Sequence, residues 1–264
     1  MLELKDLHKT FNPGTVNAKT ALDGLSLTLW DGEFVTVIGG NGAGKSTMLN
    51  AAAGTLSVDS GEVHLDGVDV TDLPEYKRAA YIGRVFQDPM MGTAPSMHIE
   101  ENLALAARRG QKRGLRWGIT KAERERYRAL PGDLGLGLET RLSSEVSTLS
   151  GGQRQALTLL MATLKSPKLL LLDEHTAVLD PKTAAKVMAL TDQIVTREKL
   201  TTLMITHNMR NAIQYGSRLV MLHEGRVILD ISGEEKENLT VSDLLAQFAR
   251  VSGDEFASDR ALLS

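Results

Sequence analysis

Hydrophobic positions alternate with polar ones over much of the N-terminal part of the chain, which is the spacing of half-buried β-strands. Residues 2–7 and 21–30 are two such stretches, and a loop is expected between them at 11–15. Residues 32–40 form a β-branched run bounded by glycine, which predicts a buried strand. The alternation in 61–70, around an Asp-Gly pair, predicts a β-hairpin.

Apolar residues three and four positions apart predict helices, and this spacing dominates from about Asp88 to Lys165. The helices predicted along the chain are 45–54, 99–109, 155–165, 181–195 and 208–216. Short apolar runs at 168–174 and 200–208 precede the last two of these helices. Strands that alternate with helices predict a parallel sheet covered on both faces, and 218–231 is expected to close it as a hairpin.

This order of elements predicts an α/β core with a helical insertion, and not two domains joined by a linker. We expect a single domain over 1–240. Its core would comprise about 1–88 and 165–240, with an inserted helical subdomain at about 89–164. Residues 241–264 are expected to form a short C-terminal helical tail.

The composition narrows the classes of partner. The chain has 264 residues and a formal net charge of -3, so it lacks the net positive charge that attracts nucleic acid. Aromatic residues make up 4%, too few to build base-stacking platforms. The absence of cysteine excludes disulfides and thiolate metal sites and fits a reducing cytosol. The charged N-terminus and the short aliphatic runs predict neither a signal peptide nor a membrane span.

One segment, Arg108 to Arg128, is locally basic, with nine Lys/Arg against two Glu. It is either a solvated charged face or a contact with lipid headgroups or a membrane partner. Trp117 within the segment slightly favours the second interpretation.

Residues 39–46, GGNGAGKS, fit the phosphate-binding pattern G-x-x-x-x-G-K-[ST] between a predicted strand and a predicted helix, the context that this pattern requires. Backbone N–H groups of such a loop turn inward around a phosphate, Lys45 adds a cation toward the β/γ-phosphates, and the Ser46 hydroxyl can bind Mg²⁺. Thr47 follows, near the α-phosphate. The nucleotide-binding residues expected in this P-loop are Gly39, Asn41, Gly42, Ala43, Gly44, Lys45, Ser46 and Thr47.

Polar residues at the ends of apolar runs are the candidates for hydrolysis. Asp173 lies at the carboxyl end of a predicted strand, where ligands of open α/β sheets bind, and could hold Mg²⁺ through water. The adjacent Glu174 could polarise the attacking water. Gln87 could bind Mg²⁺ or the lytic water, and His207 could contact the γ-phosphate. Taken singly, a glutamine or histidine at such a place is more often a core or loop residue. Both residues end apolar runs, which would place them at the same sheet edge as the phosphates, and this agreement favours a role in the nucleotide site. The remaining histidines, His175 among them, lack metal-ligand spacing and are expected to be structural.

A second anion site is predicted at 149–153, LSGGQ. Ser150 precedes Gln153 by three residues, a capping-box spacing, and an apolar-periodic helix follows. A well-capped helix is the simplest interpretation, but each glycine in the first turn costs up to about 1 kcal/mol compared with alanine. Gly151 and Gly152 are explained if a ligand approaches the backbone closely at this helix N-terminus.

These motifs, in this order, resemble those of the ATP-binding cassette (ABC) ATPases, whose signature sequence is LSGGQ, and the resemblance covers essentially the whole chain. It implies a RecA-like P-loop core with an antiparallel β subdomain and an inserted α-helical subdomain. Where many family members have proline after the catalytic glutamate, this chain has His175. The further roles that the resemblance implies are adenine stacking for Phe11, the Q-loop for Gln87, Walker B for Asp173 and Glu174, the D-loop for Asp180 and the switch loop for His207.

The resemblance also implies a homodimer in which two subunits pack head to tail. ATP, with Mg²⁺, would lie between the P-loop of one subunit and the signature motif of the other. Ser150 and the N–H groups of Gly151 and Gly152 would complete the γ-phosphate cage, Gln153 belongs to the same site, and Asp180 would couple the two sites.

A single cassette without membrane spans implies separate transmembrane permease subunits, docked near the Q-loop and the segment from about Met90 to Arg109, at the cytoplasmic face of the membrane. The length from Gln87 to Leu149 leaves no room for the coiled-coil arms of DNA-repair relatives. The family likeness favours a bacterial importer that works with a solute-binding protein. The alternatives are the ATPase subunit of an exporter and a soluble, non-transport ABC ATPase. The segments DEHTAVLDPKTA and THNMRNA are similar in sequence to those of importer cassettes for amino acids, in particular aromatic ones such as tryptophan.

Overall fold

The computed structural model describes residues 1–111, 114, 118–133 and 137–252, and the contacts within it define two compact units. The first unit combines Met1–Arg78 with Lys199–Ser264, and the second is Ala79–Glu198. The expected division between a core and a helical subdomain at 89–164 stays a prediction.

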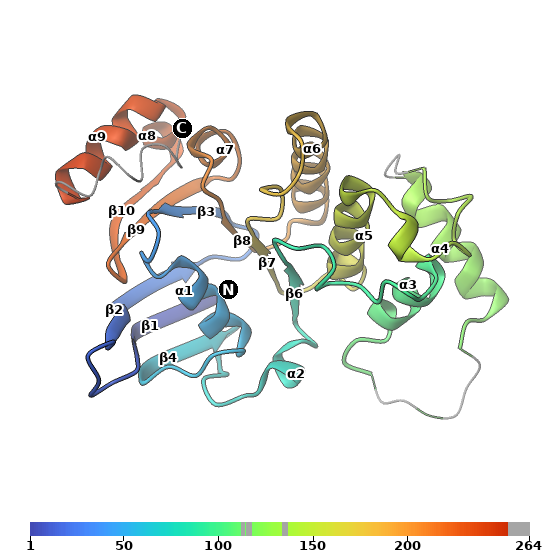
Figure 1. Cartoon of the computed structure of the whole chain (residues 1–264), viewed down its shortest axis with the longest axis horizontal. Helices are drawn as coiled ribbons and strands as arrows, with labels where there is room; N and C mark the ends of the chain where they lie inside the picture. Colours follow the sequence, from blue (N-terminus) through green and yellow to red (C-terminus); the bar gives the residue numbers. More distant parts are fainter. Residues whose placement is uncertain (112–113, 115–117, 134–136, 253–264) are drawn as a thin grey trace. The chain divides into compact units, whose positions relative to one another are not determined.

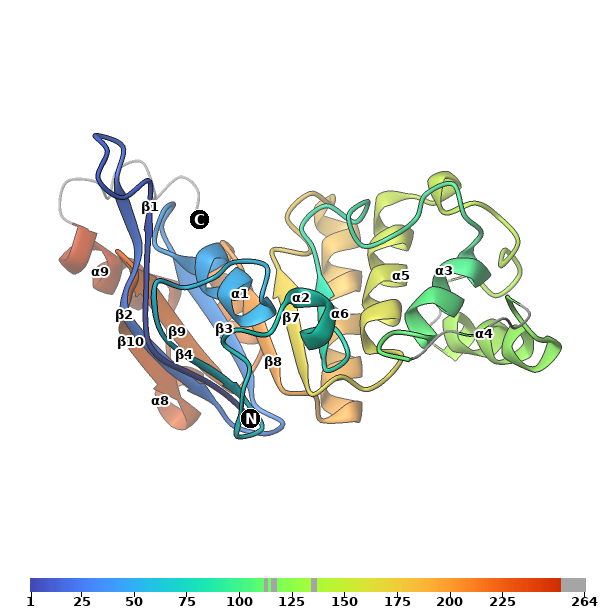
Figure 2. The same ribbon diagram turned by 90° about the horizontal axis from the view of Figure 1, so that it is seen from below.

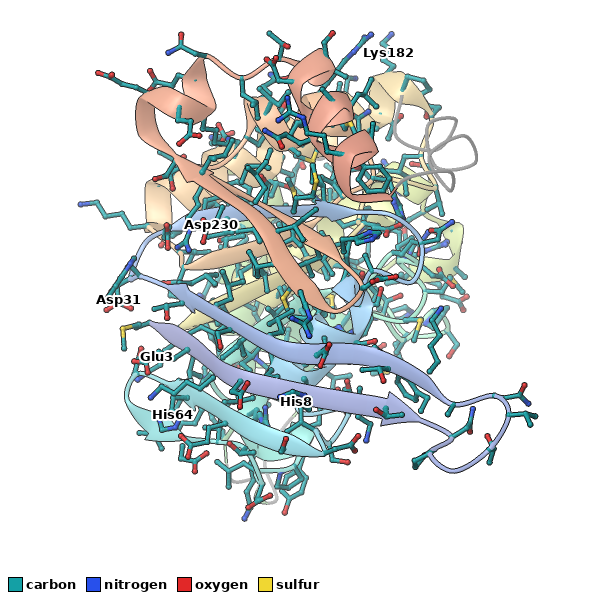
Figure 3. The ribbon with its side chains drawn as sticks, turned by 90° about the vertical axis from the view of Figure 1, so that its left-hand side faces the viewer. Glu3, His8, Asp31, His64, Lys182 and Asp230 are labelled. Atoms are coloured by element: carbon teal, nitrogen blue, oxygen red, sulfur yellow. The ribbon has the colours of Figure 1, made fainter. Side chains whose placement is uncertain are left out.

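An antiparallel sheet forms the N-terminal part of the first unit, with the strand order β2-β1-β4-β5. Its strands are β1 (Leu2–Phe11), β2 (Lys19–Leu29), β4 (Ser60–Leu65) and β5 (Val68–Asp69). β1 pairs with both β2 and β4, and Phe11 at its end lies opposite Lys19. Figure 3 shows Glu3, His8 and His64 on these strands. The two predicted N-terminal strands and the hairpin are confirmed, and the first two strands extend further toward the loop than the alternation indicated.

The other strands of the first unit form a mostly parallel arrangement. They are β3 (Phe34–Gly39), β8 (Thr202–Ile205), β9 (Arg218–His223) and β10 (Arg226–Ser232). β3 pairs in parallel with both β8 and β9, and β10 returns antiparallel to β9 as the predicted closing hairpin. Every residue of β3 is buried, as expected for a parallel strand covered on both faces.

The same unit also contains helices. They are α1 (Lys45–Ala53), α2 (Glu75–Arg78), α7 (Met209–Gln214), α8 (Gly233–Glu237) and α9 (Val241–Ser252). α1 and α7 contact β3, and α9 contacts α7 (Figure 1). Leu244 and Phe248 of α9 join Met209, Ala212 and Met221 in one buried cluster. The expected C-terminal tail therefore begins as a helix whose apolar face is buried, and residues 253–264 lie outside the described residues.

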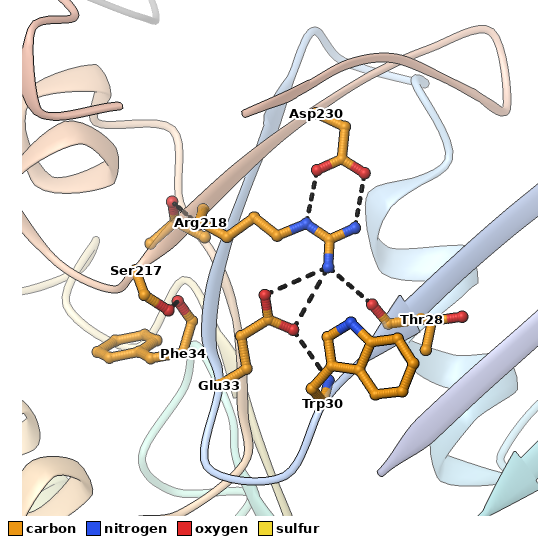
Figure 4. Close-up of polar contacts among 8 residues, drawn as sticks. Thr28, Trp30, Glu33, Phe34, Ser217, Arg218 and Asp230 are labelled. Carbon is orange, nitrogen blue, oxygen red and sulfur yellow. Dashed lines mark hydrogen bonds and ion pairs between the residues drawn. The ribbon is translucent and has the colours of Figure 1, made fainter. Parts of the chain in front are cut away.

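Arg218 joins three segments around the base of β3 (Figure 4). Its Nε and Nη2 donate to the two carboxylate oxygens of Asp230 at 2.5 and 2.6 Å, which ties β9 to β10. Its Nη1 donates to the carbonyl oxygen of Thr28 at 2.8 Å and to Glu33 at 3.2 Å, and Glu33 in turn accepts from the backbone N–H of Trp30. These carboxylates raise the pKa of the Arg218 guanidinium, because they stabilise its charged form.

The second unit combines a parallel strand pair with helices. Its elements are β6 (Ile82–Val85), α3 (Ile99–Ala107), α4 (Lys121–Asp133), a 3-10 turn (Val146–Thr148), α5 (Gly151–Thr163), β7 (Leu169–Asp173) and α6 (Pro181–Glu198). β6 runs parallel to β7, and α5 contacts β6, α3 and α6. Figures 1 and 2 show α5 and α6 side by side. Leu103, Tyr127 and Leu157 lie in the apolar core that α3, α4 and α5 share.

The basic segment is partly neutralised by carboxylates of the second unit. Arg124 donates to both carboxylate oxygens of Glu100, at 2.7 and 2.9 Å, and Arg108 donates to Glu123 at 3.1 Å. Trp117 and the cations at 112, 113 and 116 lie outside the described residues, so a contact with lipid headgroups stays a prediction. Among the helices of the described residues, none combines the length and the hydrophobicity that a membrane span requires.

Candidate functional site

The P-loop connects β3 to α1 and leaves the start of that helix open to a ligand. Gly44 has a φ of 97°, and a Cβ at this position would lie 2.4 Å from the carbonyl oxygen of Ala21, so only glycine fits. Within the described chain no side chain caps the N-terminus of α1, and its first turn carries no acidic residue. Backbone N–H groups at such a helix start attract and bind anions.

The Lys45 side chain lies along the loop that it belongs to. It is 6% exposed, and its Nζ donates to the carbonyl oxygens of Gly39 and Gly40 at 2.7 and 2.8 Å. Ser46 is exposed and Thr47 half-buried on the first turn of α1. The loop therefore offers a buried cation, open N–H donors and an exposed hydroxyl, which together can bind a polyphosphate.

Lys19 is a further cation beside this loop that the sequence did not single out. Its Nζ lies 2.8 Å from where a Cβ of Gly42 would be. Phe11, the predicted adenine-stacking residue, is 38% exposed and lies opposite Lys19 in the β1–β2 pair. The pairing of β1 with β2 brings Lys19 beside the loop. The sequence alone does not give this register, so it did not predict the position of Lys19.

The P-loop follows the carboxyl end of β3, and His207 follows the carboxyl end of β8, the parallel neighbour of β3 in the first unit. Val37 of β3 lies opposite Ile205 of β8, and the N–H of Thr206 donates to the carbonyl oxygen of Val37 at 3.1 Å. His207 is half-buried and precedes Asn208, the N-cap of α7. The shared edge that the sequence predicted for His207 and the phosphate loop is therefore present in this unit.

Gln87 and Asp173 share an edge of the strand pair in the second unit. Val85 of β6 lies opposite Leu172 of β7, so the exposed Gln87 and the strand-end Asp173 follow neighbouring parallel strands. Arg84 donates to the Asp173 carboxylate at 3.3 Å, and its guanidinium lies 4.6 Å from the centre of the Phe86 ring. The predicted metal ligands offer hard oxygen donors, a carboxylate, a carboxamide and a hydroxyl, which are the ligands that Mg²⁺ prefers.

The backbone turns sharply directly after Asp173. Glu174 is half-buried and has a φ of 45°, a left-handed conformation that is uncommon for residues other than glycine. The N–H of Ala177 donates to its carbonyl oxygen at 2.9 Å. His175, the next residue, is 1% exposed, and burial lowers the pKa of its imidazole to about 4, so the ring is neutral at physiological pH.

The signature segment forms the capping box that its spacing predicted. The Ser150 hydroxyl accepts from the N–H of Gln153 at 3.3 Å, and the Gln153 side chain accepts from the N–H of Ser150 at 3.2 Å. Ser150 and Gly151 are exposed. A Cβ on Gly152 would lie 2.1 Å from the methyl group of Thr183 on α6. Gly152 is therefore required by close packing of α5 on α6 within the unit, whereas at Gly151 the nearest atom would be at an ordinary 3.4 Å.

A groove of about 560 Å³ runs between α5 and α6 and begins at the signature segment. Ser150, Gly152 and Gln153 line its start, and Val187 and Gln193 line it further along α6. At the start of α6, Asp180 accepts from the N–H of Thr183 at 3.1 Å, and hydrogen bonds from Thr183 lower the pKa of the Asp180 carboxyl. Asp180 thus acts as a helix N-cap, a role that the sequence reading did not assign to it.

The chain is similar to known proteins along most of its length. Residues 22–177 match the family model described as ABC transporter. A tyrosine transport ATP-binding protein of Clostridioides difficile is 49% identical over 248 residues, which cover 94% of this chain and 98% of that protein. A methionine import ATP-binding protein of Bartonella henselae is 35% identical over 231 residues, 86% of this chain and 64% of its own length. A solved dimeric ATP-binding cassette in a post-hydrolysis state with ADP and Pi is 30% identical, with a TM-score of 0.75 over 88% of this chain and 98% of that one.

Proposed function

The chain belongs to the ABC transporter family of ATP-binding proteins, and from this premise we propose that it is the energy-coupling subunit of a bacterial importer for an amino acid. As a member of this family it binds ATP and is an ATP hydrolase. The observation that carries the importer proposal is its similarity, along nearly the whole length of both chains, to a tyrosine transport ATP-binding protein.

The proposed nucleotide site starts from the P-loop. Its backbone N–H groups and Lys45 bind the β- and γ-phosphates, and Phe11 stacks on the adenine. Ser46, Asp173 and Gln87 would hold Mg²⁺, which supplies positive charge to the phosphates when it is bound. The oxygen donors of these three side chains support that assignment.

The proposed hydrolytic residues follow from the same family assignment. Glu174 polarises the attacking water, and His207 contacts the γ-phosphate. The backbone after the strand end at Asp173 supports the role of Glu174, because a left-handed residue directly after a buried strand turns the chain sharply at the edge where ligands of α/β sheets bind.

The proposed dimer is head to tail. Ser150 and Gly151 are exposed at the start of a capped helix, as a surface that completes the γ-phosphate site of a second copy must be. The similar solved cassette that binds ADP and Pi is dimeric, which supports a dimer. Hydrolysis would remove a phosphate that both subunits contact and so open the interface.

The proposed membrane partner is a pair of permease subunits at the cytoplasmic face, with a solute-binding protein on the other side. Met90, Met91 and Leu105 are exposed apolar residues after β6 and on α3, and Met91 is 70% exposed. Such side chains suit a docking surface for a helix of the permease. The relatives named for tyrosine and methionine transport support an amino acid as the solute, and we propose an aromatic one.

Uptake by proteoliposomes that contain the chain, its permease and its binding protein tests this function. We expect uptake of tyrosine, phenylalanine or tryptophan that requires ATP and stops in the Glu174→Gln variant. ATP-driven efflux of the solute would instead support an exporter. Failure of the chain to associate with a permease would favour a soluble ABC ATPase.

A further inference from the structure

His175 makes one specific side-chain contact inside the second unit. Its ring is buried, and its Nε2 lies 3.0 Å from the hydroxyl oxygen of Thr191 on α6. Thr191 is fully buried as well. His175 directly follows Glu174, so this contact anchors the residue next to the proposed catalytic carboxylate.

The hydrogen bonds around Thr191 determine which ring nitrogen carries the proton. The Thr191 hydroxyl lies 2.8 Å from the carbonyl oxygen of Val187, one turn earlier on α6. A carbonyl only accepts, and a hydroxyl has one proton, so Thr191 donates to Val187. Its oxygen must therefore accept from His175, which fixes the proton of the neutral imidazole on Nε2.

The helix that receives this hydrogen bond also contacts the signature segment. Thr183, two turns before Thr191, packs its methyl group so closely on Gly152 that no Cβ fits there. Asp180 caps the start of the same helix through the N–H of Thr183. α6 is thus held at one point by the residue after Glu174 and at another by the first turn of the signature helix.

We propose that His175 is a positioning residue, which holds Glu174 in its left-handed backbone conformation by donating a hydrogen bond from Nε2 to Thr191. An uncommon backbone conformation persists only where the surrounding contacts enforce it. A rigid link from this turn to α6 fixes the direction of the Glu174 carboxylate. The same helix also packs on Gly152 of the signature segment through Thr183.

The inference rests on the proposed role of Glu174, and a double-mutant cycle on the full chain tests it. His175→Leu removes the donor, and Thr191→Val removes the acceptor with little change of shape. We expect each to lower kcat for ATP about 10- to 100-fold, as a misplaced catalytic group does, and to change the KM for ATP less than twofold. The double variant should be no slower than the slower single variant, because both remove the same hydrogen bond.

Two further variants separate positioning from packing. His175→Gln places an amide N–H where Nε2 donates, so it should recover most of the lost kcat. Thr163→Val is a matched control on α5: its hydroxyl also donates to a carbonyl one turn earlier, that of Leu159 at 2.9 Å, and it should leave kcat within twofold of the parent.

Glu174→Gln is measured beside them, so that the two claims fail separately. If Glu174→Gln still hydrolyses ATP, the proposed role of Glu174 is wrong. If it abolishes hydrolysis while His175→Leu and Thr191→Val keep the parent kcat, the positioning role of His175 is wrong. Additive losses in the double variant, or an equal loss with Thr163→Val, would also overturn it.

Discussion

At the scale of single residues, the structure shows why particular residues are required at the starts of α1 and α5, beyond what the two sequence motifs indicate. The sequence predicts the P-loop glycines, and the structure adds the reason at Gly44, where only glycine clears a carbonyl oxygen. Gly152 satisfies a different requirement, contact with Thr183, which no spacing along the chain could reveal. The sequence also predicts His175 to be structural, and its neutral buried ring becomes visible only with α6 packed against it. Contacts between segments distant in the chain are what sequence patterns leave out.

The position of Lys19 beside the P-loop predicts a contribution to phosphate binding. We expect Lys19→Met to weaken binding of ATP and ADP about three- to tenfold, because an exposed cation near an anion contributes on the order of 1 kcal/mol. Adenosine, which carries no phosphate, should bind equally well. Fluorescence titration with each compound measures this. Lys5→Met is the control, since Lys5 pairs with Glu3 on β1; equal affinities of the Lys19 variant and the parent for ATP would refute the prediction.

The buried imidazole of His175 predicts a stability that depends on pH. Its pKa is lowered from 6.5 to about 4 in the folded chain, so the unfolded chain binds the additional proton between these values. Above about pH 6.5 this difference in proton binding does not lower the free energy of unfolding. As the pH falls from 6.5 toward 4, the free energy of unfolding decreases by on the order of 3 kcal/mol in total. Urea unfolding of the parent should therefore lose about 2 kcal/mol more between pH 7 and pH 5 than unfolding of His175→Gln. Parallel pH profiles for the two proteins would show that the ring is not held neutral.

At the scale of elements, period-two and period-3.6 patterns are sufficient to predict the strands of the first unit and the helices α1, α5 and α6. These patterns do not predict which side chains connect one element to another. Arg218 bridges β9, β10 and the loop before β3. The sequence around Arg218 predicts only the start of an apolar strand and gives no sign of this bridge. The partners Thr28, Glu33 and Asp230 become neighbours only after the sheet forms.

This bridge predicts a large cost for Arg218→Met. The substitution leaves the largely buried carboxylate of Glu33 without its guanidinium, and breaking such a pair costs about 3 kcal/mol. Arg226→Met is the matched control, because Arg226 pairs with Asp23 through a side chain that is 66% exposed and should cost less than about 1 kcal/mol. Urea unfolding of both variants gives the two free energies, and similar losses would contradict a structural role for the Arg218 bridge.

At the scale of the whole molecule, we propose that the chain uses two helix N-termini to bind phosphate, the P-loop in the first unit and the signature segment in the second. The order of motifs in the sequence was sufficient to predict the family and its fold. The sequence could not show that Ser150 and Gly151 remain exposed, because exposure is a property of the packed unit. An exposed, capped and glycine-rich helix start is what a contact with the nucleotide of a second copy requires.

The most direct test of this head-to-tail dimer is size-exclusion chromatography of Glu174→Gln with ATP and Mg²⁺, with and without the additional change Ser150→Arg. We expect Glu174→Gln to elute as a dimer, because ATP that is not hydrolysed continues to join the two subunits. The variant with Ser150→Arg should elute as a monomer that still binds ATP, because the bulky cation blocks only the contact made across the interface. Elution of the Ser150→Arg variant as an equally stable dimer, or loss of ATP binding by its monomer, would contradict the assignment of the signature segment to the site of a second copy.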